Sequence, residues 1–194
     1  MSFLHKSPPL LHYMISLIRS VIIDFRYNDW TIADYFRKQG AQIGNNCRID
    51  IRSEFGDEPY LISIGNHVHI CRGVILHTND GGRWIFSEEI PDINVWGKIV
   101  IEDNCLIGLN TQLLPNIRIG KNSIVGAGSV VISGSNIPPN SIVIGIPARV
   151  IGSTVKYKEK CLAAWKEQRP PAEYVKNLKE RKQKRKEHLT KLFP

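Results

Sequence analysis

Branched aliphatic residues recur at an interval of six along the second half of the chain. They occupy eight successive positions: Ile101, Ile107, Leu113, Ile119, Val125, Val131, Ile137 and Val143. A period of six matches neither the period of an α-helix, about 3.6 residues, nor the alternation of an ordinary strand. It predicts a parallel β-helix, in which each hexad supplies one short strand and one corner and three hexads complete a triangular coil.

The positions within a hexad have separate structural tasks. We expect the aliphatic side chain to point into the prism and the small fifth residue to fit under the corner. That fifth residue is Cys105, Thr111, Ser123, Ser129, Ser135 or Ser141. Glycine follows the aliphatic residue at Gly108, Gly120 and Gly126. We expect it there because glycine tolerates the backbone angles of a turn.

The repeat begins before residue 101 and is broken twice. Weaker hexads start at Ile43, the register slips by three residues after Pro59–Tyr60, and the pattern restarts at Ile64. Leu76 ends this second run, and the next run begins at Ile101, at a distance that is one residue more than a multiple of six, so the register is interrupted again. Residues 78 to about 98 form an aromatic, glycine-containing insertion. Long loops on rigid scaffolds often carry functional sites, although this one could instead cover a neighbouring subunit.

Helices are predicted before the repeats, in an N-terminal segment of residues 1–40. One or two helices fit residues 10–38, with Asp29 or Thr31 as a candidate N-cap. The stretch Leu10–Phe25 is apolar but shorter than the roughly 20 residues that a membrane span requires. We expect it to pack on the protein or to lie at a membrane surface. The β-helix domain itself is predicted over residues 41–152.

A basic helical extension is predicted over residues 153–194. Two helices fit residues 156–168 and 172–192, separated by Pro170–Pro171. The chain has a formal net charge of +8, and much of the excess lies between Lys176 and Lys191. Interspersed glutamates and scarce aromatic residues favour a solvated helical face over a nucleic-acid site. Contact with anionic lipid at the inner face of the membrane remains an alternative.

The four cysteines point to a cytoplasmic protein. They are Cys47, Cys71, Cys105 and Cys161, which are widely spaced and lack the paired spacing of a metal site. We interpret them as reduced packing residues.

Three segments resemble the hexapeptide-repeat acyltransferases. They are Ile107–Thr111, Val125–Val131 and the closing Gly145–Ile151, and with the hexads the resemblance covers residues 43 to 152. It is strongest to the branch that acetylates surface polysaccharides and related sugars. The resemblance implies a left-handed β-helix, a homotrimer with active sites between neighbouring prisms, and acetyl-CoA as co-substrate, with no metal.

Transfer of an acetyl group to a sugar hydroxyl requires a base, and neutral histidine suits that task. His77 is the candidate general base because it follows the inward-pointing Leu76 and stands where the insertion begins. The alternative is a solvent-exposed histidine on a strand. His67 and His69 alternate on another strand and could bind metal only with His77 as third ligand, which we disfavour. We expect His69 to contact the acceptor instead.

The sequence departs from the family pattern beside this histidine. In the polysaccharide branch the histidine commonly precedes Asp-Gly-Gly directly, whereas here Asn79 fills that place and His77 lies two positions earlier. We expect Asn79, Asp80 and Trp84 to contact the acceptor. Asp80 could equally be a turn former, and Trp84 a loop anchor. Four further carboxylates could reach the cleft and are not ranked by the sequence: Asp57, Glu58, Glu88 and Glu89.

The resemblance also assigns donor contacts to the later coils. Ala127, Gly128 and Ser129 match the family's pantetheine-binding run, where small residues permit close approach of the ligand. Gly108 and Asn110 match an earlier part of the same wall. Arg149 matches the position near the nucleotide phosphates, where a guanidinium suits phosphate oxygens. Turn geometry alone could explain the glycines, and Arg149 could be a solvated end residue.

These observations predict an acetyl-CoA-dependent O-acetyltransferase that modifies a sugar of a surface polysaccharide or its precursor. The same resemblance leaves three alternatives: acetylation of an antibiotic or other small molecule, N-acetylation of a nucleotide sugar, or a noncatalytic trimeric scaffold.

Overall fold

The computed structural model describes Met14, Ile23 and residues 25–170 and 181–193 of the chain of 194 residues. The chain divides into two compact units, Met1–Gly152 and Ser153–Pro194. Each unit is described by itself below.

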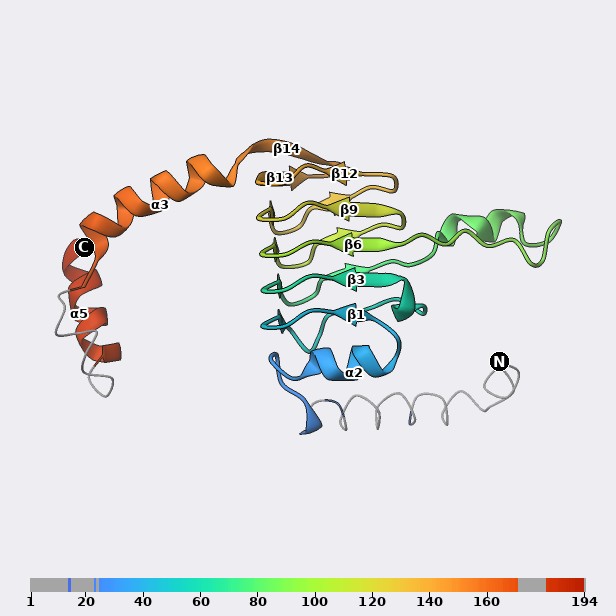
Figure 1. Cartoon of the computed structure of the whole chain (residues 1–194), viewed down its shortest axis with the longest axis horizontal. Helices are drawn as coiled ribbons and strands as arrows, with labels where there is room; N and C mark the ends of the chain where they lie inside the picture. The colour runs from blue at the N-terminus through green and yellow to red at the C-terminus, as the bar shows by residue number, and fades with distance from the viewer. Residues whose placement is uncertain (1–13, 15–22, 24, 171–180, 194) are drawn as a thin grey trace. The chain divides into compact units, whose positions relative to one another are not determined.

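The first unit is a stack of short parallel strands that form three sheets, as the period of six predicts (Figure 1). The five-stranded sheet contains β1 (Gln42–Ile43), β3 (Ile62–Ile64), β6 (Ile99–Ile101), β9 (Ile117–Ile119) and β12 (Asn136–Ile137). The six-stranded sheet contains β2 (Arg48–Ile49), β4 (His69–Ile70), β7 (Leu106–Ile107), β10 (Ile124–Val125), β13 (Ser141–Gly145) and β14 (Ala148–Ser153). The three-stranded sheet contains β5 (Ile75–Leu76), β8 (Gln112–Leu113) and β11 (Val130–Val131).

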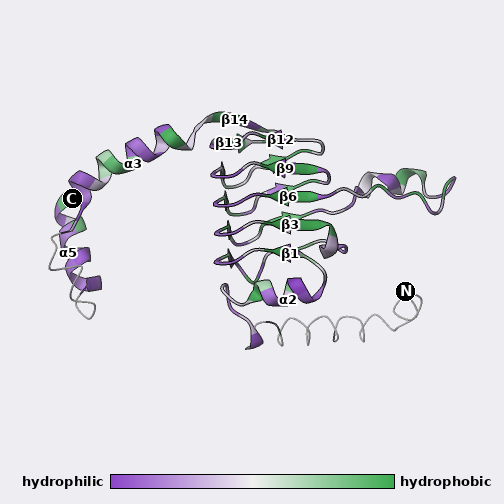
Figure 2. Cartoon of the chain, in the orientation of Figure 1, coloured by the Kyte–Doolittle hydropathy of each residue, from purple (hydrophilic) through white to green (hydrophobic). Residues whose placement is uncertain are grey.

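The strand register confirms the hexad reading. Ile101 pairs with Ile119 and Ile107 with Val125, so each regular coil takes three hexads. All eight aliphatic residues of the repeat are buried, and they form one continuous hydrophobic core with the earlier coils (Figure 2). Small fifth residues lie under the corners as expected. For example, the Gly126 carbonyl accepts from the Thr111 hydroxyl over 3.2 Å and from the Ser129 hydroxyl over 2.7 Å, so side-chain hydroxyls satisfy a backbone group at the corner.

The glycine that follows the aliphatic residue is needed for space. A Cβ at Gly108 would lie 2.5 Å from the Ala127 nitrogen, and one at Gly120 would lie 2.5 Å from the Pro139 nitrogen. Neither glycine has a positive φ, so our expectation from turn angles was wrong at these positions. The close approach of the next coil is the physical reason, because the two backbones meet where a side chain would start.

Asparagine occupies many of the corner positions that do have a positive φ. Asn104, Asn122 and Asn140 stack at one corner of successive coils, with φ between 57° and 60°. Their side chains form a ladder in which the Asn104 amide donates to Asn122 over 2.9 Å and the Asn122 amide donates to Asn140 over 3.1 Å. Asparagine is among the few non-glycine residues that adopt this conformation readily. His67 extends the ladder through a 2.8 Å contact between its Nδ1 and Asn104 Oδ1.

Both predicted register breaks are insertions into otherwise regular coils. Ile43 pairs with Ile64 instead of residue 61, so three extra residues are present, and a short 3-10 helix, η2 (Pro59–Leu61), lies there. Ile64 pairs with Ile101 instead of residue 82, which leaves 19 extra residues. These form an arm, residues 78–97, that leaves the stack between β5 and β6 (Figure 1). The arm contains a second 3-10 helix, η3 (Gly81–Phe86).

One end of the stack is covered by α2 (Ile32–Lys38). Ile32, Ala33 and Phe36 face the core, and the Phe36 ring stacks on Phe55 with 3.8 Å between ring centroids. Thr31 is the N-cap residue, rather than Asp29. Of the stretch Leu10–Phe25, all but Met14, Ile23 and Phe25 lies outside the described residues, so its predicted packing or membrane contact is not described.

The second unit contains α3 (Thr154–Gln168) and α5 (Arg181–Leu192). Helix α3 begins two residues earlier than the sequence predicts, because the Ser153 hydroxyl caps it by accepting from the Val155 N–H over 3.1 Å. Residues 171–180, which include the start of the second predicted helix, lie outside the described residues. No described helix is long and apolar enough to cross a membrane.

The four cysteines are free thiols. Burial raises the pKa of Cys47, Cys71 and Cys105. In addition, the Cys105 thiol donates to the Gly120 carbonyl over 3.3 Å, as the hydroxyls do at other corners. These contacts fit the packing role that the hexad pattern assigns to the fifth position.

Replacing Gly120 with alanine tests the spacing of the coils. The added Cβ would meet the backbone before Pro139, which cannot move without distorting the next coil. We expect the Gly120→Ala substitution to lower the free energy of unfolding by roughly 1–3 kcal/mol in denaturant titrations. A matched control is Gly152→Ala, where the Cβ meets nothing within 4 Å. Equal stability of the two variants would contradict the spacing account.

Candidate active site

His77 lies directly after β5, where the arm leaves the prism. Its backbone N–H donates to the Leu113 carbonyl in the next coil over 2.9 Å. The residues on either side, Leu76 and Thr78, are both buried, whereas His77 is half-buried. The register places His77 in one row with Leu114 and Ile132. The imidazole is therefore the polar member of an otherwise apolar row along the edge of the three-stranded sheet.

The His77 side chain contains a buried atom without a partner. Its Nε2 is inaccessible to solvent and makes no hydrogen bond with any residue that the structure describes. Burying a polar nitrogen in this way costs free energy, and such groups in folded proteins call for a specific explanation. A role as a proton acceptor would explain the missing partner, and it requires the imidazole to turn so that Nε2 becomes accessible to a substrate.

Three side-chain donors from the arm converge on the carboxylate of Glu58. The Thr78 hydroxyl donates to Oε2, the Asn79 amide donates to the same oxygen over 3.3 Å, and the Trp96 indole donates to Oε1 over 2.9 Å. Burial raises the pKa of Glu58, but these three hydrogen bonds outweigh burial and leave the pKa below its usual value. The carboxylate is therefore ionised at neutral pH. Sequence reasoning did not rank Glu58 above the other carboxylates, which are exposed.

The predicted acceptor residues on the arm have different environments. Asn79 is half-buried and its amide is bound to Glu58. Asp80 caps η3, because its Oδ1 accepts from the Gly82 N–H over 2.8 Å. This is the turn-forming role that the sequence left open beside acceptor contact. Trp84 is 77% exposed and has no side-chain partner among the described residues. Its ring does not anchor the arm within its own chain and is open to a contact from outside it.

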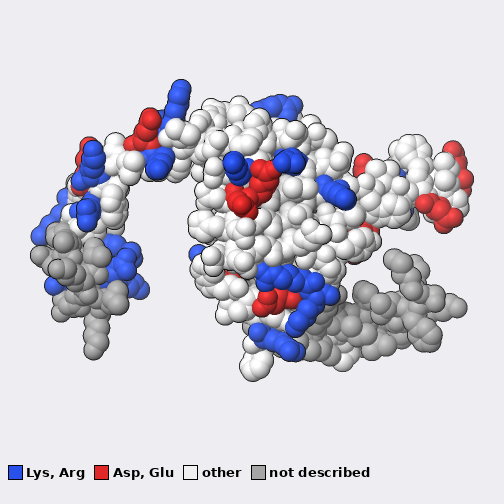
Figure 3. Space-filling model, viewed as in Figure 1, with Lys and Arg blue, Asp and Glu red and all other residues white. Residues whose placement is uncertain are grey.

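The tip of the arm is acidic, while much of its length is apolar. Figure 3 shows the acidic side chains gathered there; they belong to Glu88, Glu89 and Asp92. Ile85 is 76% exposed nearby. Such exposed apolar surface is typical of a segment that contacts another molecule.

His69 does not lie beside His77 in one chain. It belongs to β4 of the six-stranded sheet, in a row with Arg48 and Leu106, whereas His77 follows a strand of the three-stranded sheet. Burial lowers the pKa of His69, and the positive charge of Arg48 lowers it further. His67 takes part in the corner ladder instead. No group of three or more potential metal ligands occurs among the described residues.

The predicted donor residues gather at one corner of the prism. Gly108 and Asn110 follow β7, and Ala127 and Gly128 follow β10 in the next coil, with the Gly128 N–H donating to the Leu109 carbonyl over 2.7 Å. Asn110, Ala127 and Gly128 are exposed, and a Cβ at Gly128 would meet nothing within 4 Å. This corner lies just before β8 and β11, whereas His77 lies just after β5. The two therefore lie at opposite ends of the strands of the three-stranded sheet.

Ser129 and Arg149 differ in what they can offer a ligand. The Ser129 side chain is fully buried, and its hydroxyl donates to the Gly126 carbonyl over 2.7 Å, so any contact with a ligand would use its backbone. Arg149 is exposed on β14, and one of its guanidinium nitrogens donates to the Ala148 carbonyl over 3.0 Å.

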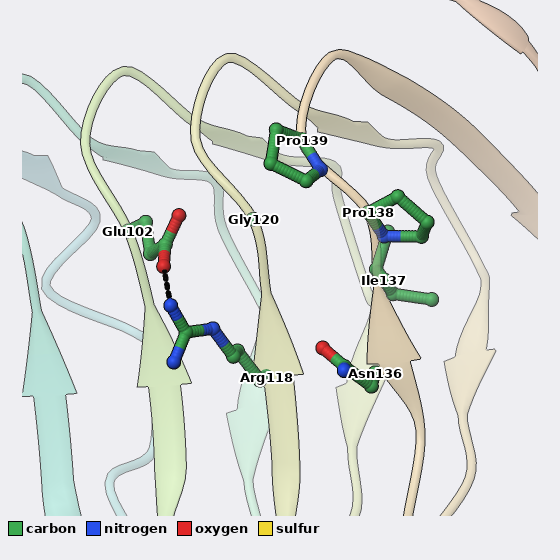
Figure 4. A pocket seen from close by; sticks show the side chains of 7 residues that line it. All are labelled: Glu102, Arg118, Gly120, Asn136, Ile137, Pro138 and Pro139. Atoms are coloured by element: carbon green, nitrogen blue, oxygen red, sulfur yellow. Dashed lines mark hydrogen bonds and ion pairs between the residues drawn. The ribbon is translucent and has the colours of Figure 1, made fainter.

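A separate hollow of about 410 Å³ lies on the face of the five-stranded sheet (Figure 4). Its lining consists of Glu102, Arg118, Gly120, Asn136, Ile137, Pro138 and Pro139. Arg118 forms an ion pair with Glu102, which also accepts from the Lys121 N–H over 2.8 Å. The two charged residues of this lining, Arg118 and Glu102, thus neutralise each other's charge. We therefore place the candidate active site at His77, where a polar nitrogen is left unpaired.

Comparisons with known proteins agree with this architecture. The family described as "Bacterial transferase hexapeptide (six repeats)" matches residues 98–133. Protein CapG of Staphylococcus aureus is 46% identical over 66% of this chain and 75% of its own length. The galactoside O-acetyltransferase of Escherichia coli K12 is 30% identical over 77% of this chain and 72% of its own.

A solved structure is similar as well. It is a hexapeptide-repeat acetyltransferase from Vibrio cholerae O1 biovar eltor, in complex with acetyl coenzyme A. The two are 30% identical, with a TM-score of 0.53, over 59% of this chain and 60% of the other.

The environment of His69 predicts its titration. Because its pKa is lowered in the folded protein, protonation occurs first in the unfolded chain as the pH falls below the ordinary value of 6.5. The contribution of neutral His69 to the free energy of unfolding is therefore present above pH 6.5 and is lost as the pH falls below that value. In NMR titrations we expect the His69 imidazole, assigned with a His69→Gln variant, to titrate below pH 6.5. A midpoint above 6.5 would contradict the burial described here.

Proposed function

Because the chain belongs to the hexapeptide-repeat acyltransferase family, we propose that it transfers an acetyl group from acetyl-CoA to a sugar hydroxyl of a surface polysaccharide or its precursor. The observation that carries this proposal is the unpartnered, buried Nε2 of His77 at the root of the arm. The galactoside O-acetyltransferase activity of a relative supports a sugar acceptor.

His77 would act as the general base. Once the imidazole has turned so that Nε2 is accessible, this nitrogen takes the proton from the acceptor hydroxyl as the oxygen bonds to the acetyl carbonyl carbon. The bond between that carbon and sulfur then breaks, and the imidazolium returns its proton to the departing thiolate. Acetyl-CoA supplies the activated acyl group. Backbone N–H groups that point at the carbonyl oxygen would stabilise its developing negative charge. Fixing the two reactants beside each other would supply much of the rate enhancement.

The residues at the donor corner fit a long, thin ligand. Ala127 and Gly128 are small and exposed, so their backbone amides can approach an extended pantetheine chain, together with Gly108, Asn110 and the backbone of Ser129. The exposed guanidinium of Arg149 suits the phosphates at the other end of the ligand.

A homotrimer of left-handed prisms, as in the family, would complete the site. Within one chain the three-stranded sheet separates His77 from the donor corner, so neither group can serve the other directly. A neighbouring copy packed against this sheet would bring its own donor corner toward His77 and place the exposed Trp84 beside an acceptor. The exposed apolar residues at the edges of the sheet, such as Ile132, support such packing.

Replacement of His77 tests the assignment of the base. We expect His77→Ala to lower kcat by roughly 100- to 10,000-fold, the usual contribution of a positioned general base. The measurement is thiol release from acetyl-CoA in the presence of a saccharide acceptor. Full activity of the variant would rule out His77 as the base.

Arg149→Ala is the matched comparison. If Arg149 binds phosphate and takes no part in proton transfer, its loss raises the KM for acetyl-CoA and leaves kcat largely unchanged. A fall in kcat equal to that of His77→Ala would show that the two variants share a structural defect. Melting curves and molecular mass in solution, measured for both variants, check this directly.

Peripheral membrane contact is a second part of the proposal, with a cytoplasmic location at the inner face. Helix α3 exposes Val155, Leu162 and Trp165, and lysines flank them, while α5 is strongly basic. We expect binding to vesicles that contain anionic lipid, weakened by added salt. Cosedimentation assays measure this. Absence of binding at low salt would remove the membrane contact without affecting the enzymatic proposal.

A further inference from the structure

The carboxylate of Glu58 joins three segments that are distant in the sequence. Glu58 lies in the first coil, at the start of η2. Its Oε2 accepts from Thr78 and Asn79 at the beginning of the arm, and its Oε1 accepts from Trp96 at the end of the arm. Each carboxylate oxygen therefore holds a different stem of the arm. An isolated surface carboxylate would be solvated instead.

The backbone around this contact is built for close approach. Gly56 has a φ of +44°, and a Cβ there would lie 2.4 Å from the Thr78 hydroxyl oxygen. The two stems also pair with one another, because the Asp80 N–H donates to the Val95 carbonyl over 2.9 Å and the Gly97 N–H donates to the Thr78 carbonyl over 3.0 Å. Glu58 fastens this paired unit to the coil before it.

Given the proposed acetyl transfer, on which this inference rests, we propose that Glu58 is the positioning residue for His77. The backbone of His77 is fixed on one side by the buried Leu76 and by its own bond to Leu113. On the other side it is fixed by Thr78, which Glu58 holds. Without that contact, the arm and the following segment can move, and the imidazole moves with them.

Only a carboxylate fits these three donors. Glutamine has nearly the same size, but its amide nitrogen carries hydrogens. These would lie opposite at least one of the donor groups from which Glu58 now accepts a hydrogen bond. Aspartate is one methylene shorter and could not reach both stems. The Glu58→Gln variant thus breaks at least one of the three hydrogen bonds while leaving the packing volume nearly unchanged.

The kinetic test compares Glu58→Gln with Asp57→Asn. Asp57 is the exposed neighbour, and its substitution makes the same change in charge. We expect kcat of Glu58→Gln to fall roughly 10- to 100-fold, in line with the effect of a small misplacement of a catalytic group. The KM for acetyl-CoA should stay unchanged, because the side chains that Glu58 holds, those of Thr78, Asn79 and Trp96, are not among the residues proposed to bind the donor. Asp57→Asn should behave as the wild type. Equal kcat in Glu58→Gln and the wild type would overturn the proposal.

A second variant covers the case in which Glu58→Gln does not fold. Trp96→Phe keeps an aromatic ring but removes the indole N–H that reaches Glu58. We expect a smaller fall in kcat, and a kcat equal to that of the wild type would overturn the proposal even if Glu58→Gln does not fold. Where Glu58→Gln folds, the double variant should show no fall beyond that of Glu58→Gln, since both changes break one contact. Independent, additive losses would show that the two residues act separately and would overturn the proposal.

Hydrogen exchange separates this inference from the proposed function. In Glu58→Gln, the amides of Asp80 and Gly97 should exchange faster, while core amides such as that of Gly126 keep their protection. This readout needs no acceptor, so an inactive wild type would refute the acetyltransferase proposal alone. Unchanged exchange at both stem amides would refute the role of Glu58. Faster exchange with unchanged kcat would refute its link to His77.

Discussion

The close stacking of one coil on the next is the constraint on which the structure depends. Each coil must return to the same three corners so that its inward aliphatic residues meet those of its neighbours and the strands can pair. At Gly108 and Gly120 the backbones approach so closely that no Cβ fits between them. Asparagines take the corner positions with positive φ, and small hydroxyls or thiols pair with the carbonyls beneath the corners. These requirements explain why the sequence repeats with a period of six.

The candidate site arises where this regularity is broken. Phe55 and Leu76 end corresponding hexads of successive coils, and an insertion follows each of them: η2 after the first and the arm after the second. Both breaks therefore fall at the same corner, one above the other. This stacking brings Glu58 of one insertion to the stems of the other, beside His77. A regular prism offers only rows of similar residues, so a site with varied side chains requires such an interruption.

The sequence was sufficient to predict the repeat, both breaks in its register and the place of His77 between a buried strand and the arm. It did not predict the contacts of Glu58, because they join residues 20 to 38 positions apart across an irregular insertion. The reason that we expected for glycine after the aliphatic residue was also wrong at Gly108 and Gly120. A glycine required by close contact between coils looks the same in the sequence as one required by turn angles. Likewise, the sequence led us to expect His69 to contact the acceptor, but only the sheet topology shows that His69 belongs to a different sheet from the strand that His77 follows.

The central claim is that this prism transfers acetyl groups from coenzyme A to saccharides. The most direct measurement incubates the purified protein with acetyl-CoA and a panel of saccharides that includes galactosides, and follows free thiol together with the mass of the acceptor. The account predicts thiol release that depends on a saccharide, with one acetyl group appearing on that saccharide for each thiol. Tight binding of acetyl-CoA without any acetylated product across sugars and amino sugars would contradict it.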